Sequence, residues 1–244
     1  MSRCSPLIAV LKKVPGVRES WYLSRAAGRA AANALHHSVM GRTYAAARLE
    51  ATFNHRADPW GFEHSAEERA RFQKTWDLVP PLRYRRILEI GCAEGHFTEQ
   101  IASRFPDAEI VAVDFVPLAV DRTRTRCAGR PHVRVQYVDV GKHPIEGSYD
   151  LIFCMGVLEY GPAFGELDTI RGSILGALSP AGCLVLETHA APPDLQTRWW
   201  ARRLVWGARA QHDRFQIDGI VPVAEAFVCG DARVATVFRK AARC

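Results

Sequence analysis

The stretch LEIGCAEG, residues 88–95, is the part of the sequence from which the fold can be predicted. An apolar run ends there at Gly91, and a second glycine follows at Gly95. Glycine adopts positive φ angles freely and has no side chain, so the backbone can turn tightly and approach a ligand closely. A strand that enters a helix through such a turn presents backbone N–H groups to that ligand. The stretch therefore predicts a ligand-binding turn after the first strand of a sheet.

Strand-like and helix-like segments alternate along the chain from this turn onward. Apolar runs rich in Val, Ile and Leu predict strands that are covered on both faces, at residues 85–90, 108–114, 132–139, 149–155 and 182–189. Helical spacing of apolar residues predicts helices at residues 96–105, 117–129 and 167–178. This alternation is typical of an α/β fold with a doubly wound, Rossmann-like sheet.

The C-terminal part of the chain has a different pattern. In residues 225–240, two apolar runs are joined by Gly230 and Asp231, which predicts an antiparallel hairpin that closes one edge of the sheet. With the five parallel strands, this hairpin completes a seven-stranded sheet. The C-terminal domain is expected to cover residues 84–244.

The first eighty residues are predicted to be helical and basic. Residues 1–53 form a helical N-terminal extension, rich in alanine from residue 20 onward. Residues 54–83 comprise a break, NHRADPWGFEHS, and a further helix that ends before Pro80 and Pro81. With 244 residues, the chain is long enough for one large domain with this appendage.

The net charge and the cysteine content bear on the binding partners and the cellular compartment that can be expected for the protein. The net charge is +6, but no run of five or more basic residues occurs, so we interpret the charge as solvated surface and expect no nucleic-acid partner. No apolar run approaches the ~20 residues of a membrane span, and no signal peptide is expected. Seven scattered cysteines without a CxxC pair predict a reducing, cytoplasmic location and no structural metal.

The spacing around the glycine turn discriminates between two ligands. A dinucleotide fingerprint counted from Gly91 would need glycines at positions 93 and 96, where the chain has alanine and histidine. The alternative pattern, acidic-x-Gly-x-small-x-Gly, is satisfied by Glu89, Gly91, Ala93 and Gly95. This pattern, with the acidic strand ends VAVD and VQYVDV and the segments YDLIFCMGVLEY and LSPAGCLVLETH, resembles the class I methyltransferases over about residues 85–190.

The resemblance implies that S-adenosylmethionine is the cofactor and that its site lies along the strand ends. Asp114 matches the family's acidic residue for the ribose hydroxyls, Asp139 matches the one for the adenine amino group, and Met155 faces the methionine moiety. The full set of predicted cofactor-binding residues is Trp60, Glu89, Gly91, Ala93, Gly95, Asp114, Phe115, Asp139, Val140 and Met155.

A second resemblance concerns the segment before the first strand. Asp58, Pro59, Trp60 and Phe62, with RYRR leading into the strand, are similar to the nodulation-type (NodS-like) methyltransferases over roughly residues 53–160. Those enzymes N-methylate an amino sugar of a chitin-like oligosaccharide. The chain departs from them in its N-terminal extension and in MGVLEY, residues 155–160, at the end of the fourth strand.

Together these patterns predict a methyltransferase that acts on an amine or hydroxyl of a small molecule, for which a sugar or a glycosylated natural product is one candidate. An RNA or protein methyltransferase and a non-catalytic subunit that binds S-adenosylmethionine remain alternatives, and the sequence leaves a homodimer open. Candidate catalytic residues follow strand ends: His189, Glu159 and Tyr160, with His212 and Asp213 as a further pair. No metal is expected, because Asp150 lies at the start of its strand and not at the end.

The break before the first strand carries one further hypothesis. Residues 54–64 can fold back over the carboxyl ends of the strands, where ligands of open α/β sheets bind. Trp60 would then lie against the methyl-bearing end of the cofactor and exclude water from the transfer. The alternative is that Trp60 attaches the N-terminal helix to the core.

Overall fold

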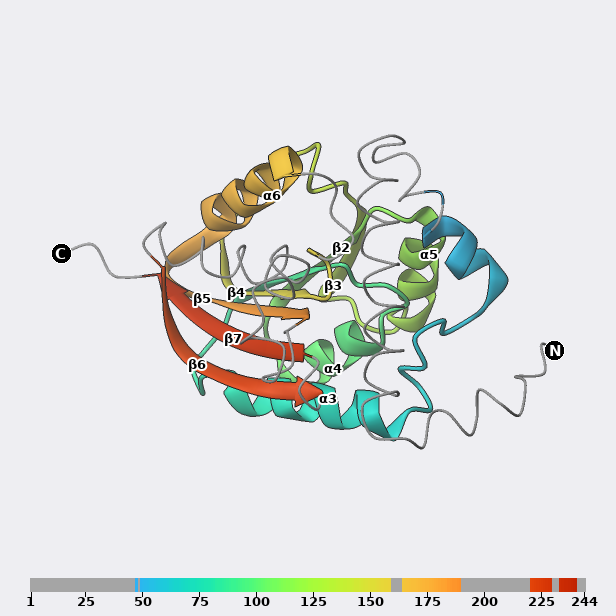
Figure 1. The fold of residues 1–244 in the computed structure, drawn as a ribbon, viewed down its shortest axis with the longest axis horizontal. Helices are drawn as coiled ribbons and strands as arrows, with labels where there is room; N and C mark the ends of the chain where they lie inside the picture. The colour runs from blue at the N-terminus through green and yellow to red at the C-terminus, as the bar shows by residue number, and fades with distance from the viewer. Residues whose placement is uncertain (1–46, 48, 159–163, 190–219, 230–232, 241–244) are drawn as a thin grey trace, which may run out of the picture. The chain divides into compact units, whose positions relative to one another are not determined.

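The computed structural model describes residues 47, 49–158, 164–189, 220–229 and 233–240 (Figure 1). The chain divides into two units, residues 1–41 and 42–244, and every described residue belongs to the second unit. Within it, none of the described helices is long and apolar enough to cross a membrane.

One seven-stranded sheet organises this unit, in the order β3-β2-β1-β4-β5-β7-β6. The strands are β1 (Arg86–Ile90), β2 (Glu109–Asp114), β3 (Val133–Tyr137), β4 (Tyr149–Met155), β5 (Leu178–His189), β6 (Ile220–Cys229) and β7 (Arg233–Lys240). Strands β1 to β5 pair in parallel with one another, whereas β7 is antiparallel to β5 and to β6. The α/β class, the seven strands and the C-terminal hairpin are thus confirmed.

Helices cover both faces of the sheet. They are α3 (Ala66–Leu78), α4 (His96–Arg104), α5 (Pro117–Arg126) and α6 (Phe164–Ala177). Figure 1 shows α3 and α4 on one side of the sheet and α6 on the other. Because side chains alternate along a strand, Ile87 of β1 packs in the cluster with α3 and α4, while Leu88 and Ile90 pack in the cluster with α6.

Two strands differ from their predicted form. β3 was expected to be covered on both faces, but it is an edge strand on which Tyr137 is 57% exposed. Its sequence, VRVQY, alternates apolar and polar residues, which is the pattern of a half-buried strand. β5 begins four residues before the expected Gly182, because Leu178 pairs with Tyr149 across a register shift in β4.

The segment before the sheet folds close to the carboxyl ends of the strands. Residues 49–55 are helical, and α3 begins after Ser65, whose hydroxyl accepts a hydrogen bond from the Glu68 amide at 3.2 Å. Leu49 and Phe53 of the helical segment pack against Val116, which follows β2. This contact brings the N-terminal segment to the edge of the sheet where the glycine turn lies.

Candidate functional site

The glycine turn has the geometry that its sequence predicts. Gly91 and Gly95 have φ angles of 79° and 80°. A Cβ atom at Gly91 would lie 2.4 Å from Val157 Cγ2, and one at Gly95 would lie 2.9 Å from Thr123 Cγ2. Both positions therefore require glycine for conformation and for space. Gly95 is also the N-cap residue of α4, so the turn passes directly into that helix.

Ala93 lies between the two glycines and also has a positive φ, of 48°. Its backbone N–H donates to Asp114 Oδ2 at 3.0 Å, and its carbonyl accepts from the Thr123 hydroxyl at 2.9 Å. The turn is thus held to the end of β2 on one side and to α5 on the other. These hydrogen bonds fix the backbone even though alanine is less suited than glycine to this conformation.

Asp114 ends β2 beside the turn and is largely buried. Its Oδ1 accepts from the Val116 amide at 2.9 Å, in addition to the Ala93 amide on Oδ2. Burial raises the pKa of this carboxyl to about 6, and the backbone hydrogen bonds act in the opposite direction. Each carboxylate oxygen keeps a further lone pair with which it can accept a ligand hydroxyl.

Glu89 lies in β1, two residues before Gly91, and is buried more deeply than Asp114. Its Oε2 accepts a hydrogen bond from the Thr98 hydroxyl at 2.5 Å. Burial raises the pKa of Glu89 to about 7. Glu89 lines a small cavity beside the glycine turn. The other residues that line it are Phe62, Arg71, Phe72, Ile90, Gly91, Cys92, Ala93, His96, Phe97 and Met155.

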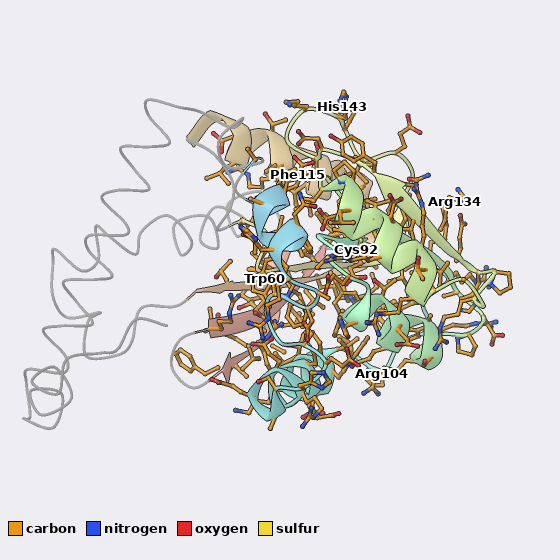
Figure 2. The ribbon with its side chains drawn as sticks, turned by 90° about the vertical axis from the view of Figure 1, so that its right-hand side faces the viewer. Trp60, Cys92, Arg104, Phe115, Arg134 and His143 are labelled. Atoms are coloured by element: carbon orange, nitrogen blue, oxygen red, sulfur yellow. The ribbon has the colours of Figure 1, made fainter. Side chains whose placement is uncertain are left out.

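A larger, mostly apolar pocket opens at the carboxyl ends of β1, β2 and β4. It is lined by Leu49, Phe53, Trp60, Phe62, Glu68, Arg71, Ile90, Gly91, Ala93, Val113, Asp114, Phe115, Val116, Val138, Val140, Met155, Gly156, Val157 and Arg233. In Figure 2, Trp60 and Phe115 are labelled near the two ends of the helical segment of residues 49–55, which contributes Leu49 and Phe53 to the pocket wall. Such a pocket at the strand ends is where open α/β sheets bind ligands.

Asp58 attaches the aromatic break to the glycine turn. Its carboxylate accepts from the amides of Phe62 and Glu63 at 2.7 and 2.9 Å. Its own N–H donates to Glu94 Oε2 at 2.6 Å, and Glu94 also forms an ion pair with Arg122. The Asp-Pro-Trp pattern therefore forms a tight local turn that is anchored on the β1–α4 loop.

Trp60 and Phe62 extend from this turn into different parts of the pocket wall. Trp60 packs against Phe53 with ring centroids 4.9 Å apart and belongs to the cluster that contains Phe115. Phe62 packs against Phe72 and belongs to the cluster that contains Met155. Trp60 thus lies on the β2 side of the pocket and Phe62 on the β4 side. Closure of this segment over a ligand stays a prediction.

A buried ionic network forms the pocket's other end. Glu187 of β5 is 0% exposed, and Arg71 Nη1 donates to both of its carboxylate oxygens, at 2.7 and 2.6 Å. Arg233 Nη1 donates to Glu187 Oε1 at 3.0 Å, and Arg71 Nε donates to Glu68 Oε2 at 2.7 Å. Of these four residues, all but Glu187 line the pocket. None of the four was predicted from the sequence. Glu68 and Arg71 lie in AEERARF, residues 66–72, which has the composition of an exposed helix.

Three possible metal ligands also approach one another beside the glycine turn. Asp58, Glu94 and His96 each offer an atom within 4.8 Å of the others. The carboxylate oxygens already accept the hydrogen bonds described above, and His96 Nε2 lies 3.1 Å from Arg126 Nη2. Two arginines in contact with the group oppose a bound cation, so this cluster is better explained as an anchor for the aromatic break.

The part of the chain that contains the glycine turn and Asp114 is similar to known proteins. Residues 87–182, from β1 into β5, match the family model described as a methyltransferase domain. Residues 87–182 thus form a methyltransferase domain, and the fold is that of the class I methyltransferases. Nodulation protein S from Rhizobium tropici is 35% identical over 131 residues, which cover 52% of this chain and 53% of that protein.

Further relatives support the same domain. Nodulation protein S from Sinorhizobium fredii is 30% identical over 59% of this chain and 64% of that protein, so the chain spans between half and two thirds of these relatives. Trans-aconitate 2-methyltransferase from Methylobacterium radiotolerans is 31% identical over 45% of this chain and 40% of that protein. The same fold is found in a crystal structure of N-methyltransferase NodS from Bradyrhizobium japonicum in complex with S-adenosyl-L-homocysteine. The two chains are 24% identical, the TM-score is 0.63, and the match covers 76% of this chain and 93% of that one.

The fold brings together most of the predicted cofactor residues. Seven of the ten line the main pocket: Trp60, Gly91, Ala93, Asp114, Phe115, Val140 and Met155. Glu89 lines the adjoining cavity, and Gly95 caps α4. Asp139 lines a separate hollow, where its Oδ1 accepts from the Gly141 amide at 3.2 Å. Its contact with adenine stays a prediction.

Four of the predicted catalytic residues lie outside the described part of the chain: Glu159, Tyr160, His212 and Asp213. The fifth, His189, is the last residue of β5, and its backbone pairs with that of Arg233, but its side chain is not described. Their roles therefore stay predictions.

Proposed function

We propose that this protein transfers a methyl group from S-adenosylmethionine to a nitrogen or oxygen atom of a small molecule. The observation that carries the proposal is the pocket at the carboxyl ends of β1, β2 and β4. It joins the glycine turn, the buried carboxylate of Asp114 and an apolar wall in one cavity.

The β2 side of the pocket suits the adenosine moiety. Asp114 would accept hydrogen bonds from the two ribose hydroxyls through its remaining lone pairs. Phe115, Val138 and Val140 supply flat and branched apolar surfaces for the adenine ring. Asp139, which precedes Val140, remains the candidate for the adenine amino group.

The β1 and β4 side suits the methionine moiety. Arg71 lines both the main pocket and the adjoining cavity, next to Gly91 and Met155. Its Nε and Nη1 atoms are bound to Glu68 and Glu187, and no described residue accepts a hydrogen bond from Nη2. We assign this nitrogen to the carboxylate of the methionine moiety, because a guanidinium is the strongest carboxylate ligand among side chains.

Methyl transfer is an in-line displacement at the sulfonium carbon, and the protein promotes it by aligning the donor with the acceptor and by excluding water. Trp60 and Phe62 would exclude water from the open side of the pocket. A relative that is named for methylation of trans-aconitate supports a small acceptor. An amino sugar or another sugar is the candidate that the resemblance of Asp58, Pro59, Trp60 and Phe62 to the NodS-like enzymes implies. Cys92, Cys127 and Cys183 are buried and form no disulfide among the described residues, which fits the cytoplasmic location that the sequence predicts.

Calorimetry with S-adenosylmethionine tests the cofactor site. Asp114→Ala removes two charge-assisted hydrogen bonds, each worth about 1.5–3 kcal/mol, so affinity should fall at least about tenfold. The matched control is Asp121→Ala, because Asp121 lies on α5 and its side chain is exposed. Unchanged affinity in Asp114→Ala would contradict the assignment.

A turnover screen tests the activity. Wild-type protein is incubated with methyl-labelled S-adenosylmethionine and one of three acceptors: glucosamine, a methyl glucoside or a phenol. Transfer of label to any of them supports the proposal. Tight binding of the cofactor with no transfer to a broad set of amines, hydroxyls and carboxylates would instead favour a non-catalytic subunit.

A further inference from the structure

The first turn of α3 presents a carboxylate to the pocket. Glu68 and Arg71 are three residues apart, so they lie on the same face of the helix, and both line the pocket. The side chain of Glu68 is 20% exposed, whereas that of Arg71 is 6% exposed. Of the two carboxylates in the ionic network, Glu68 is therefore the one that remains accessible to a molecule in the pocket, because Glu187 is 0% exposed.

The position of Glu68 is fixed by the residues behind it. Arg71 Nε holds Glu68 Oε2 at 2.7 Å, and Arg71 is itself held by the buried carboxylate of Glu187. The Phe72 ring lies beneath the guanidinium, 4.6 Å from its central carbon. The carbonyl of Glu187 in turn accepts the Gly156 amide at 3.0 Å, which ties this network to the end of β4. A side chain supported in this way keeps its orientation when a ligand binds.

The two oxygens of Glu68 differ in what they contact. Oε2 accepts from Arg71, and no described residue donates a hydrogen bond to Oε1. Among the described residues that line the pocket, Asp114 is the other carboxylic acid, and both of its oxygens already accept backbone amides on the adenosine side. Glu68 Oε1 is thus the carboxylate oxygen available at the end of the pocket beyond the methionine moiety.

We propose that Glu68 is a catalytic residue, which binds the N–H or O–H group of the acceptor through Oε1 and removes its proton during methyl transfer. This proposal rests on the methyltransferase function proposed above. The lone pair of the acceptor atom forms the new bond to the methyl carbon, and the carbon–sulfur bond breaks with its electron pair remaining on sulfur. The acceptor's proton passes to Glu68, and S-adenosylhomocysteine leaves as a neutral thioether.

The substitution Glu68→Gln isolates this role. The glutamine amide oxygen can still accept the hydrogen bond from Arg71 Nε, so the network behind the site is retained. The atom that faces the pocket then becomes an NH₂ group, which donates and cannot remove a proton. The matched control is Glu67→Gln, because Glu67 is also acidic, lies in the same turn of α3 and does not line the pocket.

Two measurements are made on wild-type protein and both variants. Calorimetry should give affinities for S-adenosylmethionine within about twofold of one another, because Glu68→Gln retains the hydrogen bond to Arg71 and Glu67 does not line the pocket. Turnover with the best acceptor of the panel should fall about 100-fold or more in Glu68→Gln, the size of effect typical of a lost general base. Turnover in Glu67→Gln should match the wild type.

The outcomes separate this inference from the function on which it rests. Wild-type turnover that persists in Glu68→Gln overturns the assignment of Glu68 and leaves the methyltransferase function intact. Loss of cofactor affinity in Glu68→Gln also overturns it, because Glu68 would then belong to the cofactor site. If the wild-type protein binds no S-adenosylmethionine, the proposed function fails, and the role of Glu68 fails with it.

Discussion

Replacing Glu187 by leucine should destabilise the protein far more than replacing an exposed glutamate. Glu187 is 0% exposed and receives three hydrogen bonds from two arginines, at 2.6, 2.7 and 3.0 Å. Leucine is close to glutamate in size, so the main effect is that Arg71 and Arg233 lose the buried carboxylate they share. Arg71 then keeps only its ion pair with the partly exposed Glu68. Removing one partner of a buried pair costs about 3–5 kcal/mol, because the other charge stays desolvated without compensation.

The assay is urea and thermal denaturation of ligand-free protein, with the transition tested for two-state behaviour. For a chain of this size, a loss of 3–5 kcal/mol lowers Tm by about 6–20 °C. Glu109→Leu is the control: Glu109 pairs with Arg86 on the surface, both side chains are about 40% exposed, and such a pair contributes at most about 1 kcal/mol.

The double substitution Glu187→Leu with Arg71→Leu identifies the cause. It removes both buried charges and leaves apolar side chains next to Phe62 and Phe72, so most of the lost stability should return. The reasoning is refuted if Glu187→Leu costs no more than Glu109→Leu. It is also refuted if the double variant is as unstable as the sum of the two single variants, because the two side chains would then be uncoupled.

Two further predictions concern the glycine turn and the aromatic break. The pKa of Glu89 is raised from 4.5 to about 7 in the folded protein, so its contribution to stability is complete below pH 4.5 and is lost as the pH rises through 7. Glu89→Gln keeps an acceptor for Thr98, and its Tm relative to the wild type should therefore increase between pH 5 and pH 8; a difference that stays constant with pH would contradict this. Trp60→Ala should weaken binding of S-adenosylmethionine and turnover with only a moderate loss of stability, because Trp60 is part of the pocket wall and only partly buried. Trp76, which is buried between α3 and the sheet, provides the comparison, because Trp76→Ala should lower the free energy of unfolding by about 3–5 kcal/mol. If Trp60→Ala loses as much stability and its folded fraction turns over normally, Trp60 only attaches the helix to the core.

Much of the fold could be predicted because its signals are local. Val, Ile and Leu runs mark β1, β2 and β4 to within one residue, since strands that are buried on both faces need apolar side chains at every position. The glycine turn is equally local, because the positive φ angles of Gly91 and Gly95 belong to single residues. The hairpin of β6 and β7 was predicted for the same reason, from two apolar runs and a turn.

Tertiary structure alone decided which strands lie at the edges and what the charged residues contact. The exposed character of β3 depends on the absence of a further strand beside it in the described sheet, and a short apolar run does not reveal that position. In the site, the amino-acid sequence by itself determined the turn and the acidic strand end at Asp114. It did not determine the role of Arg71, because its partner Glu187 is 116 residues away in the chain. Helix propensity and apolar periodicity are set by near neighbours, whereas an ion pair of this kind exists only once β5 lies beside β4 and α3 packs across the sheet.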